Sequence, residues 1–164
     1  MPGHNKKDSP RPARERIPIS PEIMKTPKFT PGGFRLAVKR ASAGRGLFAL
    51  EPIAKGVCII EYTGPALTEE EWLNARNRYL FKVTEKKTIN GWNKENTARY
   101  INHSCRPNCE IEIRKGRVFV MAKRAIKPGE ELAYYYGKEY FDQHIKPIGC
   151  KCLKCMPVAR VKTS

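Results

Sequence analysis

The sequence predicts an all-β or, more specifically, a β-rich α+β domain, and three features indicate this class. Short segments of alternating or clustered apolar residues recur from residue 34 to residue 136. Glycine- and proline-containing turns and long irregular connections separate them. Only one segment carries clear signals for the start of a helix. A chain of 164 residues has room for one such domain with tails.

The expected strands are short, and turn residues separate them. They lie at residues 34–38, in 43–49 after a glycine loop, and at 57–62, 79–83, 110–113, 117–120 and 131–136. The segment 57–62 is the richest in apolar and β-branched residues, so we expect it to be largely buried. Arg114-Lys115-Gly116 joins two alternating segments, which is typical of a hairpin.

The expected helix begins after Thr68, whose hydroxyl suits an N-cap. Glu71 stands three residues later and completes a capping box. If the helix continues, Trp72, Ala75 and Tyr79 lie along one face.

The chain is strongly basic, with a net charge of +16. Such a charge favours acidic partners, for example nucleic acid or nucleosomes, although a merely solvated surface would have the same composition. Residues 1–31 contain seven of the thirteen prolines and few apolar residues, so we expect a disordered tail. This tail is either an arm that contacts DNA or nucleosomes or a plain solubilising segment.

No apolar stretch is long enough to cross a membrane, and no apolar run follows the basic N-terminal residues as in a secretory signal. We therefore expect an intracellular protein without membrane contact. A secreted protein with three disulfides is the alternative that six cysteines leave open, but nothing else in the sequence favours it.

The most informative segment is Arg99–Asn108, which contains an amide, an imidazole, a thiol and a proline within ten residues. It resembles the Arg-Phe-Ile-Asn-His-Ser-Cys-x-Pro-Asn signature of the SET-domain protein lysine methyltransferases, with Tyr100 in place of Phe. Three further blocks resemble motifs of that family in the same order: Gly44-Arg45-Gly46, Glu61-Tyr62-Thr63-Gly64 and Gly129–Tyr136. The resemblance extends over about residues 34–155.

The resemblance implies a fold of small twisted sheets with a threaded segment, a pseudoknot. It divides the chain into a SET catalytic domain at 32–138 and a C-terminal zinc-binding segment and tail at 139–164. It also implies that S-adenosylmethionine donates a methyl group to a lysine side chain. The expected cofactor-binding residues are Gly44, Arg45, Gly46, Tyr79, Asn102 and His103. The expected catalytic residues, including the walls of the lysine channel, are Tyr136, Tyr62 and Tyr134, with Phe81 as a further candidate wall.

Each of these residues also has an ordinary structural explanation when it is taken alone. A glycine pair is usually just a turn, and aromatic residues on apolar strands are usually core. The order of the motifs favours the functional interpretation for Asn102, His103 and Tyr136.

Cys150, Cys152 and Cys155 have the C-x-C-x-x-C spacing of thiolate metal ligands. The resemblance implies that Cys105 is the fourth ligand of one structural zinc ion, with Cys109 as a weaker alternative. Cys58 lies in an apolar segment and is expected to be core. Free thiols in a reducing compartment remain the ordinary alternative.

Some positions depart from the family pattern: Arg45 replaces tryptophan, Pro65 replaces glutamate and Tyr135 replaces aspartate. No cysteine-rich region precedes the domain, so the sequence resembles a minimal, bacterial-type member. It would act in the bacterial cytoplasm or, as an effector, on the chromatin of a host nucleus. In the family that the sequence resembles, a tyrosine at the position of Tyr134 goes with mono- or dimethylation, so the resemblance implies this product. The substrate that it implies is a histone tail or another basic protein. The alternative is an inactive SET-like module that binds chromatin or nucleic acid through its basic surface.

Overall fold

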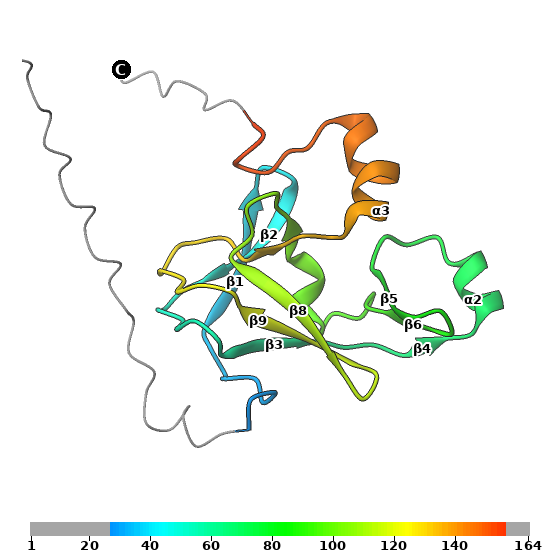
Figure 1. Ribbon diagram of the computed structural model, residues 1–164, viewed down its shortest axis with the longest axis horizontal. Helices are drawn as coiled ribbons and strands as arrows, with labels where there is room; N and C mark the ends of the chain where they lie inside the picture. The colour runs from blue at the N-terminus through cyan, green and yellow to red at the C-terminus, as the bar shows by residue number, and fades with distance from the viewer. Residues whose placement is uncertain (1–26, 157–164) are drawn as a thin grey trace, which may run out of the picture.

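The computed structural model describes residues 27–156, which form several small sheets linked by irregular segments (Figure 1). The largest antiparallel sheet contains β3 (Cys58–Tyr62), β9 (Arg117–Ala122) and β8 (Cys109–Arg114), in that order. A second has the order β4 (Ala66–Leu67), β6 (Lys87–Asn90) and β5 (Leu80–Thr84). β1 (Leu36–Ala41) pairs with β2 (Gly44–Ala49), and β7 (Asn102–His103) pairs with β10 (Ala133–Tyr134). The expected β-rich α+β class is confirmed.

The core lies where β2, β3 and β9 meet the segments around them. Leu47, Ile101, Val118, Ile126 and Leu132 are each at most 1% exposed. Burying a side chain of this size contributes about 1.5–3 kcal/mol relative to leaving it in water. Residues from distant parts of the sequence therefore hold the small sheets together.

The predicted strands are present, with shifts at their ends. β2 includes the whole Gly44-Arg45-Gly46 block, because the hairpin turn falls at Ser42 and Ala43 instead. The last predicted strand shortens from 131–136 to Ala133–Tyr134. The hairpin at residues 110–120 forms as predicted, with full register from Cys109↔Ala122 to Arg114↔Arg117.

The predicted helix α2 (Glu69–Asn74) begins with the expected capping box, in which Thr68 and Glu71 exchange hydrogen bonds. It ends sooner than expected, because Ala75 already has extended backbone with ψ 127°. Asn77 then accepts a hydrogen bond from the Tyr79 amide at 2.9 Å, a local alternative to helix. The expectation that Ala75 and Tyr79 share a helix face with Trp72 is therefore wrong.

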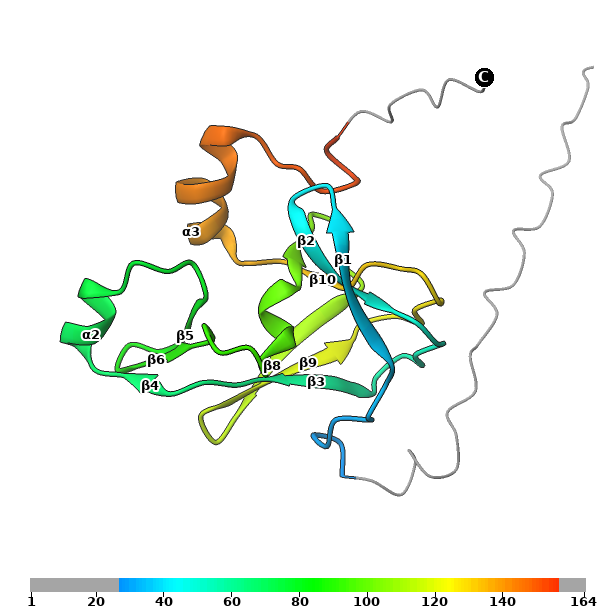
Figure 2. The ribbon, with the colours of Figure 1, turned by 180° about the vertical axis from the view of Figure 1, so that it is seen from behind.

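The expectation of a single helix is also wrong. η1 (Thr97–Tyr100) is one short 3₁₀ turn, and a longer helical segment follows Tyr136. That segment consists of α3 (Lys138–Tyr140), the π-helix η2 (Phe141–Ile145) and the 3₁₀ turn η3 (Lys146–Ile148). It lies at the same end of the molecule as α2 (Figures 1 and 2).

The packed part of the chain begins before residue 32. The rings of Phe29 and Phe119 lie 5.4 Å apart between centroids, and the Gly32 amide donates to the Cys58 carbonyl at 3.0 Å. Residues 29 and 32, at the end of the expected tail, thus contact the domain, whereas residues 1–26 lie outside the described residues and the tail boundary stays a prediction. The division at residue 138 stays a prediction. Among residues 27–156, no helix has both the length and the apolar character needed to cross a membrane.

Candidate functional site

The site is built around a pairing of two very short parallel strands. In β7 and β10, Asn102 lies opposite Ala133 and His103 lies opposite Tyr134. The Ser104 amide continues this pairing by donating to the Tyr134 carbonyl at 3.0 Å. The Asn-His pair of the signature and the tyrosines of the last motif are therefore neighbours in space.

The aromatic residues expected to line the lysine channel form one cluster. Tyr134 lies 4.8 Å from Tyr136 and 6.4 Å from Phe81 between ring centroids. Phe81 in turn lies 5.3 Å from Tyr62. Tyr140 of α3, which the sequence did not single out, packs edge-on against Tyr136 at 5.3 Å. Three expected site residues and the helical segment thus share one apolar region.

The hydroxyl groups of this cluster are hydrogen bonded or buried. The Tyr136 hydroxyl donates to the Ile101 carbonyl at 2.6 Å, and that of Tyr62 donates to the Tyr79 carbonyl at 2.8 Å. Burial raises the pKa of Tyr62, Tyr134 and Tyr136 well above the ordinary value of a tyrosine. These phenols therefore stay neutral at physiological pH.

A cavity of about 770 Å³ opens beside β7. Asn102 and His103 line it together with the β1–β2 turn and the C-terminal residues Lys151–Lys154. Its volume falls within the range of small-molecule sites, roughly 300–1,000 Å³. Next to this turn, Gly44 has φ 110° and open space where a Cβ would project. The cavity can thus accept a ligand that approaches the backbone closely.

Tyr79 does not line this cavity. It borders a separate hollow of about 560 Å³ with Trp92 and the 76–78 segment. The Arg99 guanidinium carbon lies 5.1 Å from the centre of the Tyr79 ring and 4.8 Å from that of Tyr100. Arg99 was not among the expected site residues, although it is the first residue of the signature. Hydrogen bonding to the Arg99 guanidinium lowers the pKa of Tyr100, and Arg45 adds a smaller effect in the same direction.

The four expected metal ligands gather in one place. The sulfur atoms of Cys105, Cys150, Cys152 and Cys155 all lie within 4.8 Å of one another. The sulfur of Cys105 is 3.9 Å from that of Cys150 and 3.7 Å from that of Cys155. Four thiolates placed ~2.3 Å from a central zinc ion would be about 3.8 Å apart, so this donor set fits tetrahedral zinc.

The other two cysteines lie elsewhere. Cys109 is buried, and its thiol donates to the Asn108 side chain at 3.3 Å. Cys58 packs with Phe119 and Met121 in a small core cluster, as expected. The alternative in which Cys109 is the fourth ligand therefore has no support in the geometry.

The surroundings raise the pKa of one thiol in the cluster and lower that of another. Burial, followed by side-chain hydrogen bonding with the neighbouring thiols, first of all that of Cys155, raises the pKa of Cys105 to about 12. At Cys152, burial is outweighed by hydrogen bonds from the backbone of Cys105 and Cys155, which lower the pKa to about 6. These backbone amides favour a thiolate at Cys152, which is the form that binds metal.

His103 connects the cysteine cluster to the aromatic cluster. Its Nδ1 accepts a hydrogen bond from the Tyr136 amide at 3.3 Å, which leaves the ring proton on Nε2. Nε2 lies 3.4 Å from the Cys105 sulfur. Burial lowers the pKa of His103, so the neutral ring is favoured. Both ring nitrogens of His103 thus already have a partner within the protein. A ligand can contact only the backbone of His103 and the face of its ring.

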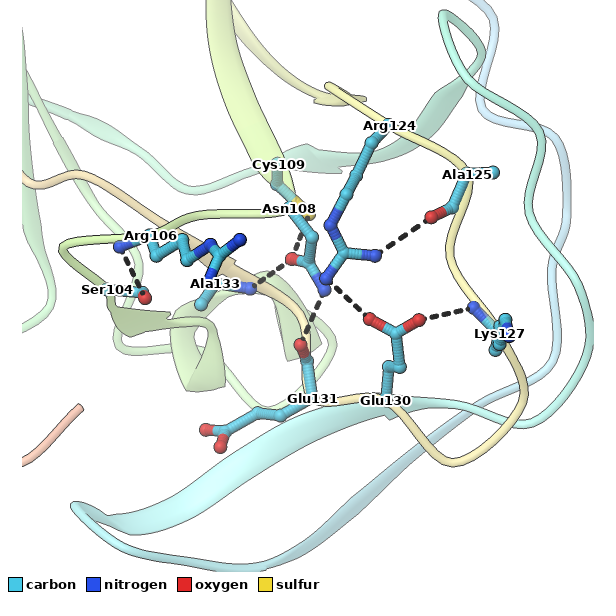
Figure 3. A network of polar contacts seen from close by, with 10 residues as sticks. All are labelled: Ser104, Arg106, Asn108, Cys109, Arg124, Ala125, Lys127, Glu130, Glu131 and Ala133. Carbon is cyan, nitrogen blue, oxygen red and sulfur yellow. Dashed lines mark hydrogen bonds and ion pairs between the residues drawn. The ribbon is translucent and has the colours of Figure 1, made fainter. Parts of the chain in front are cut away.

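A polar network supports the site from one side (Figure 3). The buried Asn108 side chain donates to the Glu131 carbonyl at 2.8 Å and accepts from the Ala133 amide at 2.9 Å. Glu130 closes the turn before β10 by accepting from Arg124 at 2.7 Å and from the Lys127 amide at 2.9 Å. These bonds fix the start of β10 against the segment that follows the signature.

Comparison with known proteins places this geometry in a family. The family model "SET domain" matches residues 44–137. The histone-lysine N-methyltransferase trr of Drosophila melanogaster is 39% identical over 125 residues, which are 68% of this chain and 5% of that protein. The histone-lysine N-methyltransferase ASHH1 of Arabidopsis thaliana is 36% identical over 120 residues, 63% of this chain and 24% of that protein. The chain thus spans a small part of these relatives, and they lend no support to the expected bacterial source.

A solved structure has a similar fold. The crystal structure of KRYPTONITE in complex with mCHG DNA and SAH superposes with a TM-score of 0.59 at 31% identity. The match covers 68% of this chain and 25% of that one.

Proposed function

The chain belongs to the SET-domain family, and from this premise we propose that it is a protein-lysine N-methyltransferase that uses S-adenosylmethionine. The observation that carries the proposal is the β7–β10 pairing, which puts Asn102 and His103 beside Tyr134. The proposed cofactor residues and the proposed lysine channel are therefore on adjacent strands. The proposal is supported by relatives named as histone-lysine N-methyltransferases and by the similar structure whose title includes SAH.

The chemistry requires a neutral amine in an environment without water. A free lysine has a pKa of about 10.4 and is charged at neutral pH. Bound S-adenosylmethionine supplies a methyl group made electrophilic by its sulfonium cation. The cluster of Tyr62, Phe81, Tyr134 and Tyr136 provides an apolar lining, which disfavours the ammonium form and holds the lysine stem.

Tyr136 is the proposed catalytic residue. Its hydroxyl and the Ile101 carbonyl lie 2.6 Å apart and form a polar pair at the edge of an apolar cluster. Because burial raises the pKa of Tyr136, its hydroxyl keeps its proton, and that proton is donated to the Ile101 carbonyl. The phenolic oxygen is thereby held in place as an acceptor that can orient the amine and the polarised methyl group. Tyr62 and Tyr134 are proposed as channel walls whose neutral hydroxyls orient the amine.

The cofactor is assigned to the 770 Å³ cavity and its neighbouring backbone. Asn102 and His103 line this cavity, and the strand that carries Gly44, Arg45 and Gly46 begins directly after its Ser42–Ala43 edge. We assign Tyr79 to the far end of the ligand, where Arg99 and Tyr100 connect its hollow to Arg45.

One zinc ion is proposed at Cys105, Cys150, Cys152 and Cys155. The thiolates would tie the C-terminal segment to the signature, and a structural ion of this kind contributes folding energy directly. Because Lys151–Lys154 also line the cavity, the metal would complete one wall of the cofactor site.

The proposed substrate is a lysine on a histone tail or another basic protein, with mono- or dimethylation favoured by Tyr134. Contact with DNA or nucleosomes is proposed for the basic N-terminal residues.

The deciding experiment measures methyl transfer and cofactor binding together. The full chain, purified with zinc, is incubated with methyl-labelled S-adenosylmethionine and histones, and labelled lysines are identified by mass spectrometry. Calorimetry measures S-adenosylhomocysteine binding. If the chain binds S-adenosylhomocysteine and labelled lysines are found, the proposal is supported. If the chain binds nucleic acid but has no affinity for the cofactor, the alternative of an inactive chromatin-binding module is established.

A further inference from the structure

Glu131 lines the cavity proposed for the cofactor and belongs to the Gly129–Tyr136 block, although no role was predicted for it. Its neighbour Glu130 points toward Arg124 and Lys127, whereas the Glu131 side chain turns away from that network (Figure 3). The Glu131 Oε1 accepts a hydrogen bond from the Asn102 side chain at 2.7 Å. Two adjacent carboxylates thus face different parts of the molecule.

The Asn102 amide nitrogen also donates to the Arg45 carbonyl at 2.9 Å. With Oε1 of Glu131 as its other acceptor, this one NH₂ group joins three chain segments: β2, β7 and the start of β10. Bonds to a charged acceptor are about twice as strong as neutral ones, so the carboxylate fixes the orientation of the amide.

Glu131 also explains why residue 46 is a glycine. A Cβ placed on Gly46 would lie 2.4 Å from the Glu131 Oε1 and 2.9 Å from the Ala41 Cβ. Real Cβ atoms do not approach other atoms so closely, so either the carboxylate or the strand would have to move. The backbone reinforces the contact, since Phe48 and Glu131 form an antiparallel bridge.

We infer that Glu131 is a positioning residue that holds Asn102 and the Gly44–Gly46 strand in the geometry that binds the cofactor. The inference rests on the proposed function, because it assigns the cofactor to the cavity that Glu131 and Asn102 line. Glu131 acts through Asn102 and the Arg45 backbone.

The test compares Glu131→Ala, Glu131→Gln and the control Glu110→Gln in the full zinc-loaded chain. In Glu131→Ala, the KM for S-adenosylmethionine and the Kd for S-adenosylhomocysteine should rise about tenfold, with kcat at saturating cofactor within about threefold. Glu131→Gln keeps an acceptor for Asn102 and should recover most of the affinity. Glu110→Gln removes the same charge from an exposed residue of β8 that lies outside the lining of the cavity, and it should leave KM unchanged.

A double-mutant cycle that combines Gly46→Ala with Glu131→Ala tests whether the Glu131 carboxylate requires a glycine at position 46. Gly46→Ala alone should weaken cofactor binding, and its additional effect should shrink in the Glu131→Ala background, because the 2.4 Å conflict is gone. Gly46→Ala should still weaken cofactor binding to some extent in that background, because the added Cβ would remain 2.9 Å from the Ala41 Cβ.

Two outcomes would overturn the inference: Glu131→Ala with cofactor affinity within twofold of wild type, or Glu110→Gln with an equal loss. A wild-type protein that binds no cofactor would instead refute the proposed function. Thermal melting of each variant shows that the compared proteins are folded.

Discussion

Substituting Tyr136 by phenylalanine separates the chemical role of its hydroxyl from the packing role of its ring. The ring contacts Tyr134 at 4.8 Å, Tyr140 at 5.3 Å and His103 at 5.6 Å, and phenylalanine can keep all three contacts. The hydroxyl makes one hydrogen bond, to the Ile101 carbonyl at 2.6 Å. The substitution therefore removes one polar group and little packing.

The expected losses of stability and of catalytic rate follow from these contacts. Losing one hydrogen bond costs about 1 kcal/mol of stability, which lowers the melting temperature of a domain of this size by roughly 2–8 °C. Losing a preorganised polar group at the reacting centre lowers kcat by ~10²-fold or more, equivalent to about 2.7 kcal/mol. Activity should thus fall much further than stability.

The assay measures kcat by incorporation of labelled methyl at saturating cofactor and substrate, at a temperature well below both melting transitions. Tyr135→Phe is the matched control, because Tyr135 is the adjacent tyrosine and is 45% exposed. It should retain kcat within a few fold. If Tyr136→Phe kept wild-type kcat, or if Tyr135→Phe lost as much, the assignment of the catalytic hydroxyl would be wrong.

Four further changes should have the following effects. Tyr134→Phe should raise the final number of methyl groups per lysine, because the channel loses a hydroxyl; identical product mass spectra for both proteins would contradict this. Cys152→Ser should release the zinc measured by elemental analysis and lower activity while leaving most strand content in circular dichroism, because the sheets lie outside the cluster. Deleting residues 1–26 should leave peptide methylation nearly unchanged. Phe29→Ala should lower the melting temperature by several degrees, because the contact with Phe119 is lost. If the alanine variant melted at the wild-type temperature, this contact would contribute nothing to stability.

Local patterns predicted the parts of the structure that depend on neighbouring residues. The capping box of Thr68 and Glu71 and the hairpin around Lys115 involve residues within a few positions of each other. The cysteine spacing predicted three members of the cluster, and family resemblance supplied Cys105, which is distant in sequence.

What the sequence missed depends on contacts between distant residues. The helical segment after Tyr136 begins at Gly137 without a side-chain cap, and it is only a short α-turn followed by π and 3₁₀ turns, so the usual start signal of a helix is missing. Ring packing of Tyr140 against Tyr136 stabilises it. Glu131 lies in a turn-like motif, and its contact with Asn102 spans 29 positions. Two-residue strands such as β7 are too short to show any periodicity.

The brevity of β7 and β10 also affects the order of events during folding. Each strand contributes two residues, and the closed segment between them contains the complete β8–β9 hairpin. A local hairpin forms in microseconds, whereas a parallel contact of two residues cannot offset its loop-closure entropy until the surrounding core is present. We therefore expect the site to assemble last, so that a refolding protein regains its sheet spectrum before it can retain the proposed cofactor. Cofactor affinity is thus a sensitive measure of the fraction of chains that have completed folding.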